Sequence, residues 1–370
     1  MHGCSSLLEF CDTFFSLSTR FSYRFYFATR SSDYWHDARH TVACDKQVVG
    51  QNAMGPVVTS ILEAAAPRSK SLIVSLLGDS IKPRGGAFWL GTLISACEPF
   101  DINERAVRTS VQRLSRDGWL QSERVGRKSR YALTREGGAR IDQASPRMYS
   151  PPIEAWDGTW TVAFAPPGSL QAWERSQLRK YLEWEGYTMA ASGVFLHPLG
   201  SADSLNEILG ELNLANDVFV FSARSIEAVS ALGLCDGVVQ FWDLNEASDR
   251  YLHFLSVFDP VARQLGQAPG EFSDMDLFQI RLLAIHAFRR ASLHAPRLPA
   301  ALYPNGWPGL DAYHLCKKIY SHSWQAAEQY LDRLYAEQEE RPKPPSAYFY
   351  TRFGGLAAHD DEGALSSAAG

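Results

Sequence analysis

The sequence predicts a multidomain protein of the α+β class, and three observations carry this prediction. Near residue 100, a helix with a cationic outer face precedes a short β-hairpin. Between residues 156 and 245, predicted strands alternate with predicted helices, and the chain beyond them is almost wholly helical. With 370 residues, 45% of them hydrophobic, the chain has enough apolar material for two or three domains with buried cores.

The first 66 residues are expected to lie outside these domains. Residues 1–53 are rich in Phe, Ser, Tyr and Arg, show no helical or strand periodicity, and lack the apolar core of a secretory signal. We interpret residues 1–66 as a disordered or wrongly included extension, and we expect Met54 to be the natural start, with residues 1–53 as upstream translated sequence or a disordered extension.

A first domain is predicted over residues 67–145. Two apolar segments, Ser69–Leu77 and Phe88–Cys97, predict its first two helices, and the breakers at residues 78–80 are expected to end the first of them. A loop rich in glycine and proline joins the two helices.

The third predicted helix begins after Asn103, whose short side chain suits an N-cap, and ends at Gly118. Val107, Val111 and Leu114 recur at helical spacing and predict its buried face. The opposite face carries a row of hydrogen-bond donors, namely Arg105, Arg108, Thr109, Gln112 and Arg116.

A β-hairpin is predicted directly after this helix, with strands at Leu120–Val125 and Arg130–Thr134. Its tip carries four cations, Arg124, Arg127, Lys128 and Arg130. Three helices followed by such a hairpin indicate a winged helix-turn-helix. Ten cations and five anions give residues 101–140 a net charge of +5 in a chain of net charge −5, which suits the phosphates of DNA. A solvated basic helix face is the plainer alternative, but it leaves the hairpin unexplained.

A Pro-rich linker is expected over residues 146–155, followed by a middle domain over residues 156–245. Its predicted strands and helices alternate as Thr159–Ala165, Leu170–Trp184, Gly193–Leu199, Ser204–Leu214 and Asp217–Ser222. This alternation predicts a ferredoxin-like α+β sandwich.

The last domain is predicted to be helical, over residues 246–340. Met275–Leu293 and Asp311–Glu340 carry apolar residues at helical spacing, and a loop rich in proline and aromatic residues lies between them. Residues 341–370, with several prolines and a small-residue end, are expected to form a flexible tail.

Enzyme chemistry has little support in the sequence. The six cysteines have no metal-ligand spacing, no nucleophile motif is present, and the ten histidines are scattered. We therefore expect no catalytic residue, no metal ligand and no cofactor. A metal-dependent nuclease is the alternative, with Asp157 as a ligand, but a lone carboxylate suits a turn or strand cap better. No apolar run reaches membrane-spanning length, and the cysteine usage suits a reducing cytoplasm.

Four stretches carry a family resemblance: SLIVSLLGDSIKPRGGAFWLGTLI (71–94), INERAVRTSVQRLSRDGWL (102–120), the YSPP…WDGTW junction (149–160) and RLLAIHAFRR…LPAALYPNGWPG (281–309). Together they resemble the PaaX family, transcriptional repressors of phenylacetic acid degradation. The resemblance implies a winged helix, a Cas2-like ferredoxin-fold domain and a helical C-terminal domain for effector binding and dimerisation. It further implies a homodimer on a palindromic double-stranded DNA operator, released by phenylacetyl-CoA or a related aryl-CoA.

The nine donors and cations named above are the expected DNA contacts. Two recognition helices are normally needed for specificity, which agrees with the implied dimer. Arginine suits guanine and glutamine suits adenine in the major groove, whereas the hairpin cations are expected to meet phosphates.

A pocket for an acyl-CoA effector should combine cations with aromatic rings. The C-terminal domain offers such a set: Arg281, His286, Arg289, Arg290, Arg297, Tyr303 and Trp307. Taken singly, each of these residues also has a structural interpretation. For example, His286 suits a hydrogen-bonded histidine in the core, and Arg289 and Arg290 suit a solvated helix face.

Overall fold

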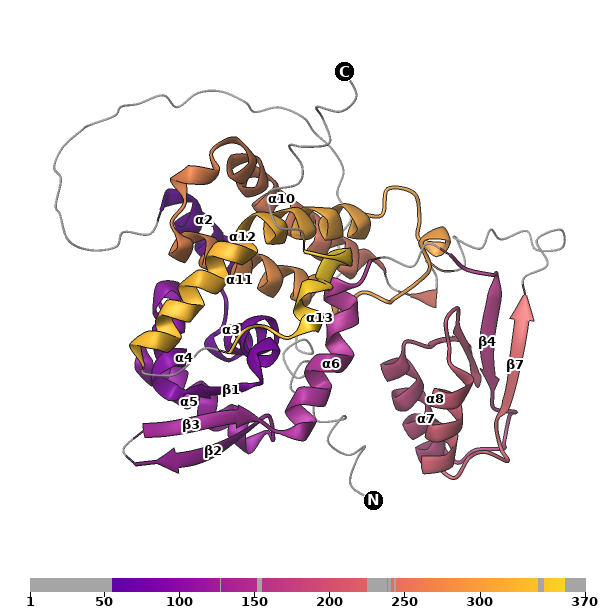
Figure 1. Cartoon of the computed structure of the whole chain (residues 1–370). Helices are drawn as coiled ribbons and strands as arrows, with labels where there is room; N and C mark the ends of the chain where they lie inside the picture. The colour runs from indigo at the N-terminus through magenta and orange to yellow at the C-terminus, as the bar shows by residue number, and fades with distance from the viewer. Residues whose placement is uncertain are drawn as a thin grey trace, which may run out of the picture. The chain divides into compact units, whose positions relative to one another are not determined.

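The computed structural model describes residues 55–126, 128–151, 155–224, 238, 241–242, 244–338 and 343–356. The chain divides into two compact units, Met1–Met54 and Gly55–Gly370. Residues 1–53, and the predictions made for them, lie outside the described residues. Figure 1 shows the elements of the second unit.

Helix α2, Pro56–Ala65, corrects the prediction that residues 1–66 form a disordered extension. Val58 and Ile61 are buried, and α2 packs against α10 (Leu244–Gln267) and α11 (Asp274–Ser292). A helix this short depends on tertiary packing for its stability. Its partners lie far along the chain, so the local sequence gave little sign of it.

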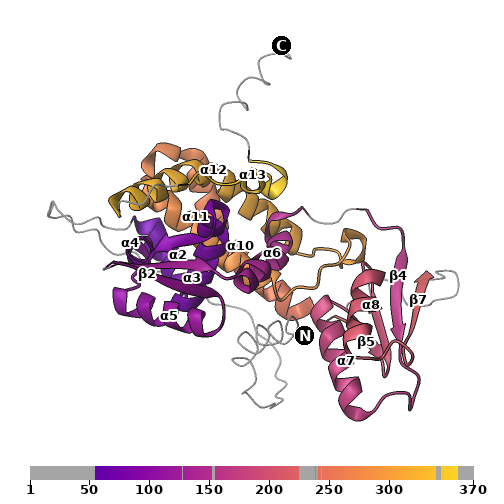
Figure 2. The same cartoon turned by 60° about the horizontal axis from the view of Figure 1, so that its bottom comes forward.

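The next segment forms three helices and a three-stranded antiparallel sheet (Figures 1 and 2). The helices are α3 (Ser69–Leu76), α4 (Leu90–Cys97) and α5 (Glu104–Arg116). The strands are β1 (Ala87–Trp89), β2 (Leu120–Val125) and β3 (Lys128–Leu133), paired in the order β1-β3-β2. Helix α5 packs against α3, α4 and β2.

Two local predictions in this segment are wrong. Ala87–Trp89 is a strand rather than the start of a helix, because Phe88 is fully buried and stacks on Tyr131 of β3, with ring centroids 6.0 Å apart. The first helix continues past its predicted end as a buried π-helical turn, Leu77–Ile81. A short 3-10 turn, Lys82–Arg84, leads on to β1, and another, Glu98–Phe100, separates α4 from α5.

Helix α6, Arg135–Tyr149, follows the hairpin and extends into the predicted linker. Residues 146–149 are therefore helical, which corrects the linker boundary. Pro146 does not end the helix, because Met148 and Tyr149 beyond it are buried and hold the last turn in place.

Two neighbouring glycines of α6 provide a test of this packing. A Cβ on Gly137 would lie 2.4 Å from the Trp119 carbonyl oxygen, whereas the nearest atom to a Cβ on Gly138 is Lys82 Cε at 3.8 Å. We expect Gly137→Ala to lower the free energy of unfolding by about 1–3 kcal/mol through overpacking. Gly138→Ala should instead raise it by up to about 1 kcal/mol through helix propensity. Urea denaturation measures both, and equal effects would contradict the packing described here.

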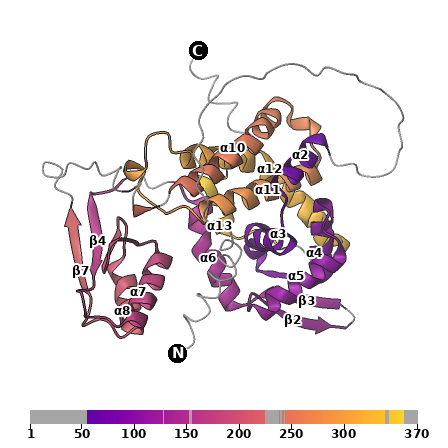
Figure 3. The same cartoon turned by 180° about the vertical axis from the view of Figure 1, so that it is seen from behind.

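Residues 159–224 form the βαββαβ arrangement of a ferredoxin-like domain, which confirms the predicted class. Its elements are β4 (Thr159–Phe164), α7 (Ala172–Glu185), β5 (Thr188–Ala191), β6 (Val194–His197), α8 (Ala202–Glu211) and β7 (Phe219–Arg224). The strands are antiparallel in the order β5-β6-β4-β7, and α7 and α8 cover one face (Figure 3). Strand β5 was not predicted.

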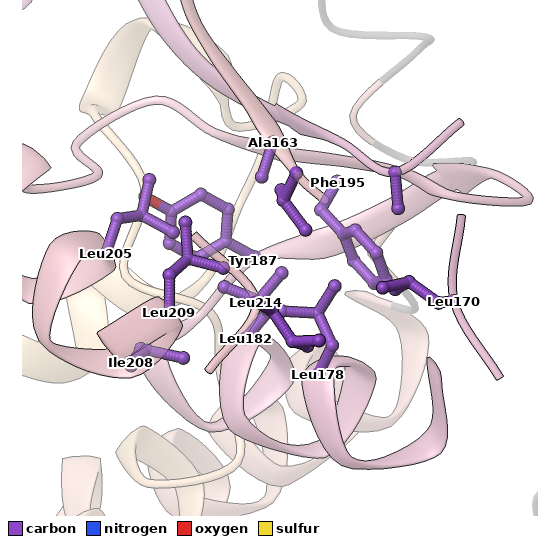
Figure 4. Packing of buried hydrophobic residues seen from close by; sticks show 12 residues of the cluster. Ala163, Leu170, Leu178, Leu182, Tyr187, Phe195, Leu205, Ile208, Leu209 and Leu214 are labelled. Carbon is purple, nitrogen blue, oxygen red and sulfur yellow. The ribbon is translucent and has the colours of Figure 1, made fainter. Parts of the chain in front are cut away.

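The two faces of this sheet pack differently. On the helical face, Ala163 and Phe195 meet leucines of α7 and α8, as Figure 4 shows. On the other face, Trp160 packs with Leu298 and Leu302, which belong to the loop between α11 and α12 (Gly309–Glu337).

The C-terminal region is helical as predicted, and α11 packs against α10, α12, α3 and α6. Two 3-10 turns, Pro269–Glu271 and Ala300–Leu302, lie in its loops. The prediction of a flexible tail over residues 341–370 is corrected for residues 343–356, and the rest of it lies outside the described residues. Residues 343–356 include α13 (Ala347–Tyr350) and a 3-10 turn at 352–354, with Phe349 and Phe353 buried.

Candidate nucleic-acid interface

Helix α5 presents all five predicted DNA-contacting side chains on one exposed face. Arg105, Arg108, Thr109, Gln112 and Arg116 are exposed, whereas the opposite face is buried through Val107, Ser110, Val111 and Leu114. The helix starts where predicted, because the Asn103 side chain accepts a hydrogen bond from the Ala106 amide at 3.0 Å.

The exposed side chains of α5 differ in whether they already form hydrogen bonds or ion pairs within the protein. Arg108 pairs with Glu104 at 2.6 Å, and Thr109 Oγ1 donates to the Arg105 carbonyl at 2.8 Å. Arg105 and Gln112 make no side-chain hydrogen bond or ion pair within the described residues. These two are therefore the readiest groups on the helix for base contacts.

A shallow surface hollow lies along the same face. Its lining residues are Asn103, Glu104, Arg105, Arg108, Thr109 and Gln112. Arg113 is also exposed on α5, and it was omitted from the sequence candidates. Its helical spacing from Thr109 and Arg116 could have revealed it.

The hairpin after α5 has a tighter turn than predicted. Val125 pairs with Lys128 and Arg124 with Ser129, so the strand pairing reaches nearer to the tip than predicted. Arg127 lies outside the described residues. Arg124 is exposed, and its Nε donates to the Gly126 carbonyl at 3.3 Å.

The other two hairpin cations contact the protein more closely. Lys128 Nζ donates to the Gln338 carbonyl at 3.3 Å, next to the end of α12, and lies 6.0 Å from the Trp89 ring centroid. Arg130 is half-buried. Among the described hairpin cations, Arg124 is thus exposed and hydrogen-bonded within the hairpin itself, whereas Lys128 reaches the end of α12.

A buried charge cluster fixes this segment to the C-terminal helices. Its members are Asp79, Arg84, Arg281, Glu328 and Arg352. The Asp79 carboxylate lies 3.1 Å from Arg281 Nη2 and 3.0 Å from Arg352 Nη1, and none of its side chain is exposed. Burial on its own would raise the pKa of Asp79, but the two guanidinium groups hold it below the usual value.

The remaining contacts extend this cluster across the fold. Glu328 of α12 accepts from Arg84 Nη2 at 2.6 Å and from Arg281 Nη1 at 2.8 Å. The Tyr149 and Tyr320 hydroxyls donate to Asp79 at 2.9 and 3.0 Å. The cluster therefore joins residues near α3 to α6, α11, α12 and the chain end.

The seven effector candidates do not form one pocket. Arg281 belongs to the buried charge cluster. Arg289 donates to the Ser71 hydroxyl at 2.9 Å, and His286 Nδ1 lies 3.1 Å from Ser75 Oγ. All three side chains are buried. Arg289 and His286 join α11 to α3, whereas Arg281 joins α11 to the turn at Leu77–Ile81 and to α12, so their polar groups are used inside the fold.

The other four candidates lie nearer the surface. Arg290 and Arg297 are exposed, whereas Tyr303 and Trp307 are half-buried. The rings of Tyr303 and Trp307 stack with centroids 4.8 Å apart and planes inclined by 6°.

Two buried histidines predict a pH dependence of stability. Burial, aided by Arg289 and Arg290, lowers the pKa of His286 to about 3, and burial beside Arg147 lowers the pKa of His197 to about 4. In the unfolded chain both histidines take up protons near pH 6.5. The free energy of unfolding should therefore fall between about pH 6.5 and 4, by about 1.4 kcal/mol per pH unit for each histidine.

Chemical denaturation across this pH range measures the slope. His286→Asn should reduce the slope by about one proton, whatever its effect on stability at neutral pH. The exposed His253 of α10 offers a matched control, His253→Asn, for which no comparable change is expected. An unchanged slope in the His286 variant would contradict the assignment.

The nuclease alternative gains no support from Asp157. Its carboxylate accepts from the Thr159 amide at 2.9 Å and from the Thr159 hydroxyl at 2.8 Å, and these hydrogen bonds lower its pKa. Asp157 thus caps the start of β4. Among the described residues, no three His, Cys, Asp or Glu side chains gather so as to hold a metal ion, and none of the described helices is long and apolar enough to cross a membrane.

Comparison with known proteins matches three family models to consecutive parts of the chain. They are the PaaX-like protein over residues 68–137, the PaaX protein central Cas2-like domain over 153–232 and the PaaX-like protein C-terminal domain over 242–333.

One curated relative is the transcriptional repressor PaaX of Escherichia coli K12. It is 35% identical over 287 residues, which cover 77% of this chain and 90% of that protein. A solved structure, of an uncharacterized protein from Mycobacterium tuberculosis, is 22% identical and covers 65% of this chain and 90% of that one, with a TM-score of 0.41. The family models and the curated relative agree along most of the chain, and the chain belongs to the PaaX family.

Proposed function

We propose that this protein is a transcriptional repressor that binds double-stranded DNA, with α5 as its recognition helix and the β2–β3 hairpin as its wing. The exposed row of donors on α5, opposite a buried face, is the observation that carries the proposal. The name of the Escherichia coli relative supports it. In this proposal the protein acts in the cytoplasm on a phenylacetate-type catabolic operon, with no catalytic residue, metal or cofactor.

The proposed protein is a homodimer on a palindromic operator. A single recognition helix contacts few base pairs, so two helices about one DNA turn apart supply the specificity. Phe219 and Phe221 are 55% and 49% exposed on β7, the last strand of its sheet within the described residues. An exposed apolar edge of this kind suits a second copy of the chain. We therefore place the dimer contact on the middle domain rather than on the C-terminal helices.

The proposed effector is an aryl-CoA thioester such as phenylacetyl-CoA, which lowers operator affinity. Helices α11 and α12 pack directly against α3 and α4, so a ligand on the C-terminal region can act on the DNA-binding segment without passing through the middle domain. Such a ligand shifts the equilibrium only by its difference in affinity for the two arrangements.

Fluorescence anisotropy tests the proposal. The full chain is titrated onto labelled DNA from its own upstream region, at several salt concentrations, and then with phenylacetyl-CoA or free phenylacetate. We expect tight binding that weakens with salt and is reversed by the thioester alone. DNA binding that is unaffected by the thioester would contradict the proposed effector but not the proposed repressor function. No preference for this DNA over unrelated DNA would overturn the function.

A further inference from the structure

The loop between α11 and α12 starts beside the end of α6, where one hydrogen bond joins the two, and two further hydrogen bonds within the loop fix its shape. Arg147 Nη1, on the last turn of α6, donates to the Leu293 carbonyl at 3.4 Å. The Tyr303 hydroxyl donates to the Pro296 carbonyl at 2.7 Å and accepts from the Leu298 amide at 3.2 Å. The two bonds of Tyr303 flank Arg297 in the chain, so they fix this arginine close to the Tyr303 ring.

Aromatic rings gather in and beside this loop. Tyr303 stacks on Trp307, and the Tyr251 ring of α10 meets Trp307 edge-on, with centroids 5.7 Å apart and planes inclined by 81°. Tyr303 and Trp307 are both half-buried. Part of each residue is therefore open to solvent, and aromatic side chains of this kind suit contact with a planar ring of a ligand.

The positive charge at this place is not neutralised. Arg147 is half-buried, and neither it nor Arg297 forms an ion pair with a carboxylate anywhere in the part of the chain that the structure describes. Burial lowers the pKa of Arg147, and the positive charge of Arg297 lowers it further, against smaller opposing effects of Tyr251, Glu185 and Tyr303. A partly desolvated guanidinium group without a counter-charge is costly, so the place is suited to an anion.

We propose that Arg147 and Arg297, beside the stacked Tyr303 and Trp307, form a binding site for a phosphate-bearing ligand that contains a planar ring. Guanidinium groups bind phosphate oxygens through two parallel N–H bonds, and two of them match a ligand with several negative charges. The assignment of this site to the effector rests on the function proposed above.

The position of Arg147 connects this site to the DNA-binding segment. Helix α6 begins directly after β3, and Tyr149, two residues beyond Arg147, donates to the buried Asp79 at 2.9 Å. A ligand that draws Arg147 toward the loop acts on the same helical turn that holds Asp79. Ligand binding and the placement of α5 therefore share one element.

The site also predicts an unusual stability effect. Arg147→Gln removes a poorly paired charge and only one long hydrogen bond, so we expect the melting temperature to stay level or rise. A residue that served packing alone would lower it. Saturating ligand should raise the melting temperature of the unaltered protein and have a smaller effect on the variant.

Isothermal titration calorimetry of the full chain tests the site, with phenylacetyl-CoA and coenzyme A as probes. We expect Arg147→Gln and Arg297→Gln each to weaken binding by about 10–100-fold. Arg263→Gln removes the same charge from an exposed pair on α10 and should change nothing. Equal affinity in all variants, or no binding of either probe by the unaltered protein, would overturn the site.

Operator binding of the same variants separates this inference from the function. Without ligand, Arg147→Gln and Arg297→Gln should bind the operator as the unaltered protein does. If DNA binding is intact and phenylacetyl-CoA still releases the Arg147 variant at the usual concentration, the repressor stands and the site is wrong. If Arg147→Gln and Arg297→Gln lose ligand affinity, but neither the unaltered protein nor the variants bind the operator, the site stands and the function is wrong.

Discussion

Replacing Asp79 with alanine is expected to lower the free energy of unfolding by about 3–5 kcal/mol. The substitution leaves Arg281 and Arg352 buried without their shared carboxylate, and it removes the acceptor of the Tyr149 and Tyr320 hydroxyls. An unpaired buried charge costs far more than the pair contributes, which is why the loss exceeds that of an ordinary hydrogen bond. Urea denaturation followed by far-ultraviolet circular dichroism measures it.

A matched control separates burial from charge. Asp259→Ala removes an exposed carboxylate that pairs with Arg263 at 2.9 Å, and exposed pairs contribute about 0–1 kcal/mol. Similar decreases in the free energy of unfolding of the two variants would contradict the large contribution expected of the buried cluster. Operator affinity measured below the unfolding transition should also fall in the Asp79 variant, because the cluster holds the segment that carries α5.

Replacing Arg105 with alanine is expected to weaken operator binding by about 10–100-fold, equivalent to about 1–3 kcal/mol. Arg105 is exposed on α5 and makes no ion pair within the described residues, so the full side chain is available to a base. Gln112→Ala should have a similar effect if Gln112 recognises adenine. Anisotropy titrations on the operator and on unrelated DNA measure affinity and specificity together.

The control for this prediction is Arg263→Ala, which removes an exposed charge of the same kind from α10. Arg124→Ala, on the hairpin, should weaken binding to both DNAs alike and reduce the salt dependence, as expected of a phosphate contact. An Arg105 variant that keeps its preference for the operator would place base recognition elsewhere.

Local signals in the sequence were enough to predict the candidate interface. The start of α5 depends on Asn103 and on the spacing of Val107, Val111 and Leu114, all within a few turns. The strand β2 has the bounds that the sequence predicted. The middle domain was likewise predicted from alternating short elements, although the four-residue β5 was too short to give a signal.

Long-range contacts explain the failures. Ala87–Trp89 becomes a strand because β3 offers it an edge, and Pro146 stays helical because the turn beyond it is buried. The partners of Asp79 lie up to 273 positions along the chain, where no periodicity can point to them. For the same reason, Arg281 was assigned to a ligand although its charge is used inside the fold.

The buried charge cluster has a consequence for how the protein is made. Asp79 and Arg84 leave the ribosome early, whereas Arg352 is separated from Asp79 by 273 positions. At about 5–20 residues per second, the last partner follows after roughly 14–55 seconds. Until Arg352 has been made, Asp79 lacks one of its two arginine partners, so the buried cluster that holds this segment cannot be complete before position 352 is synthesised.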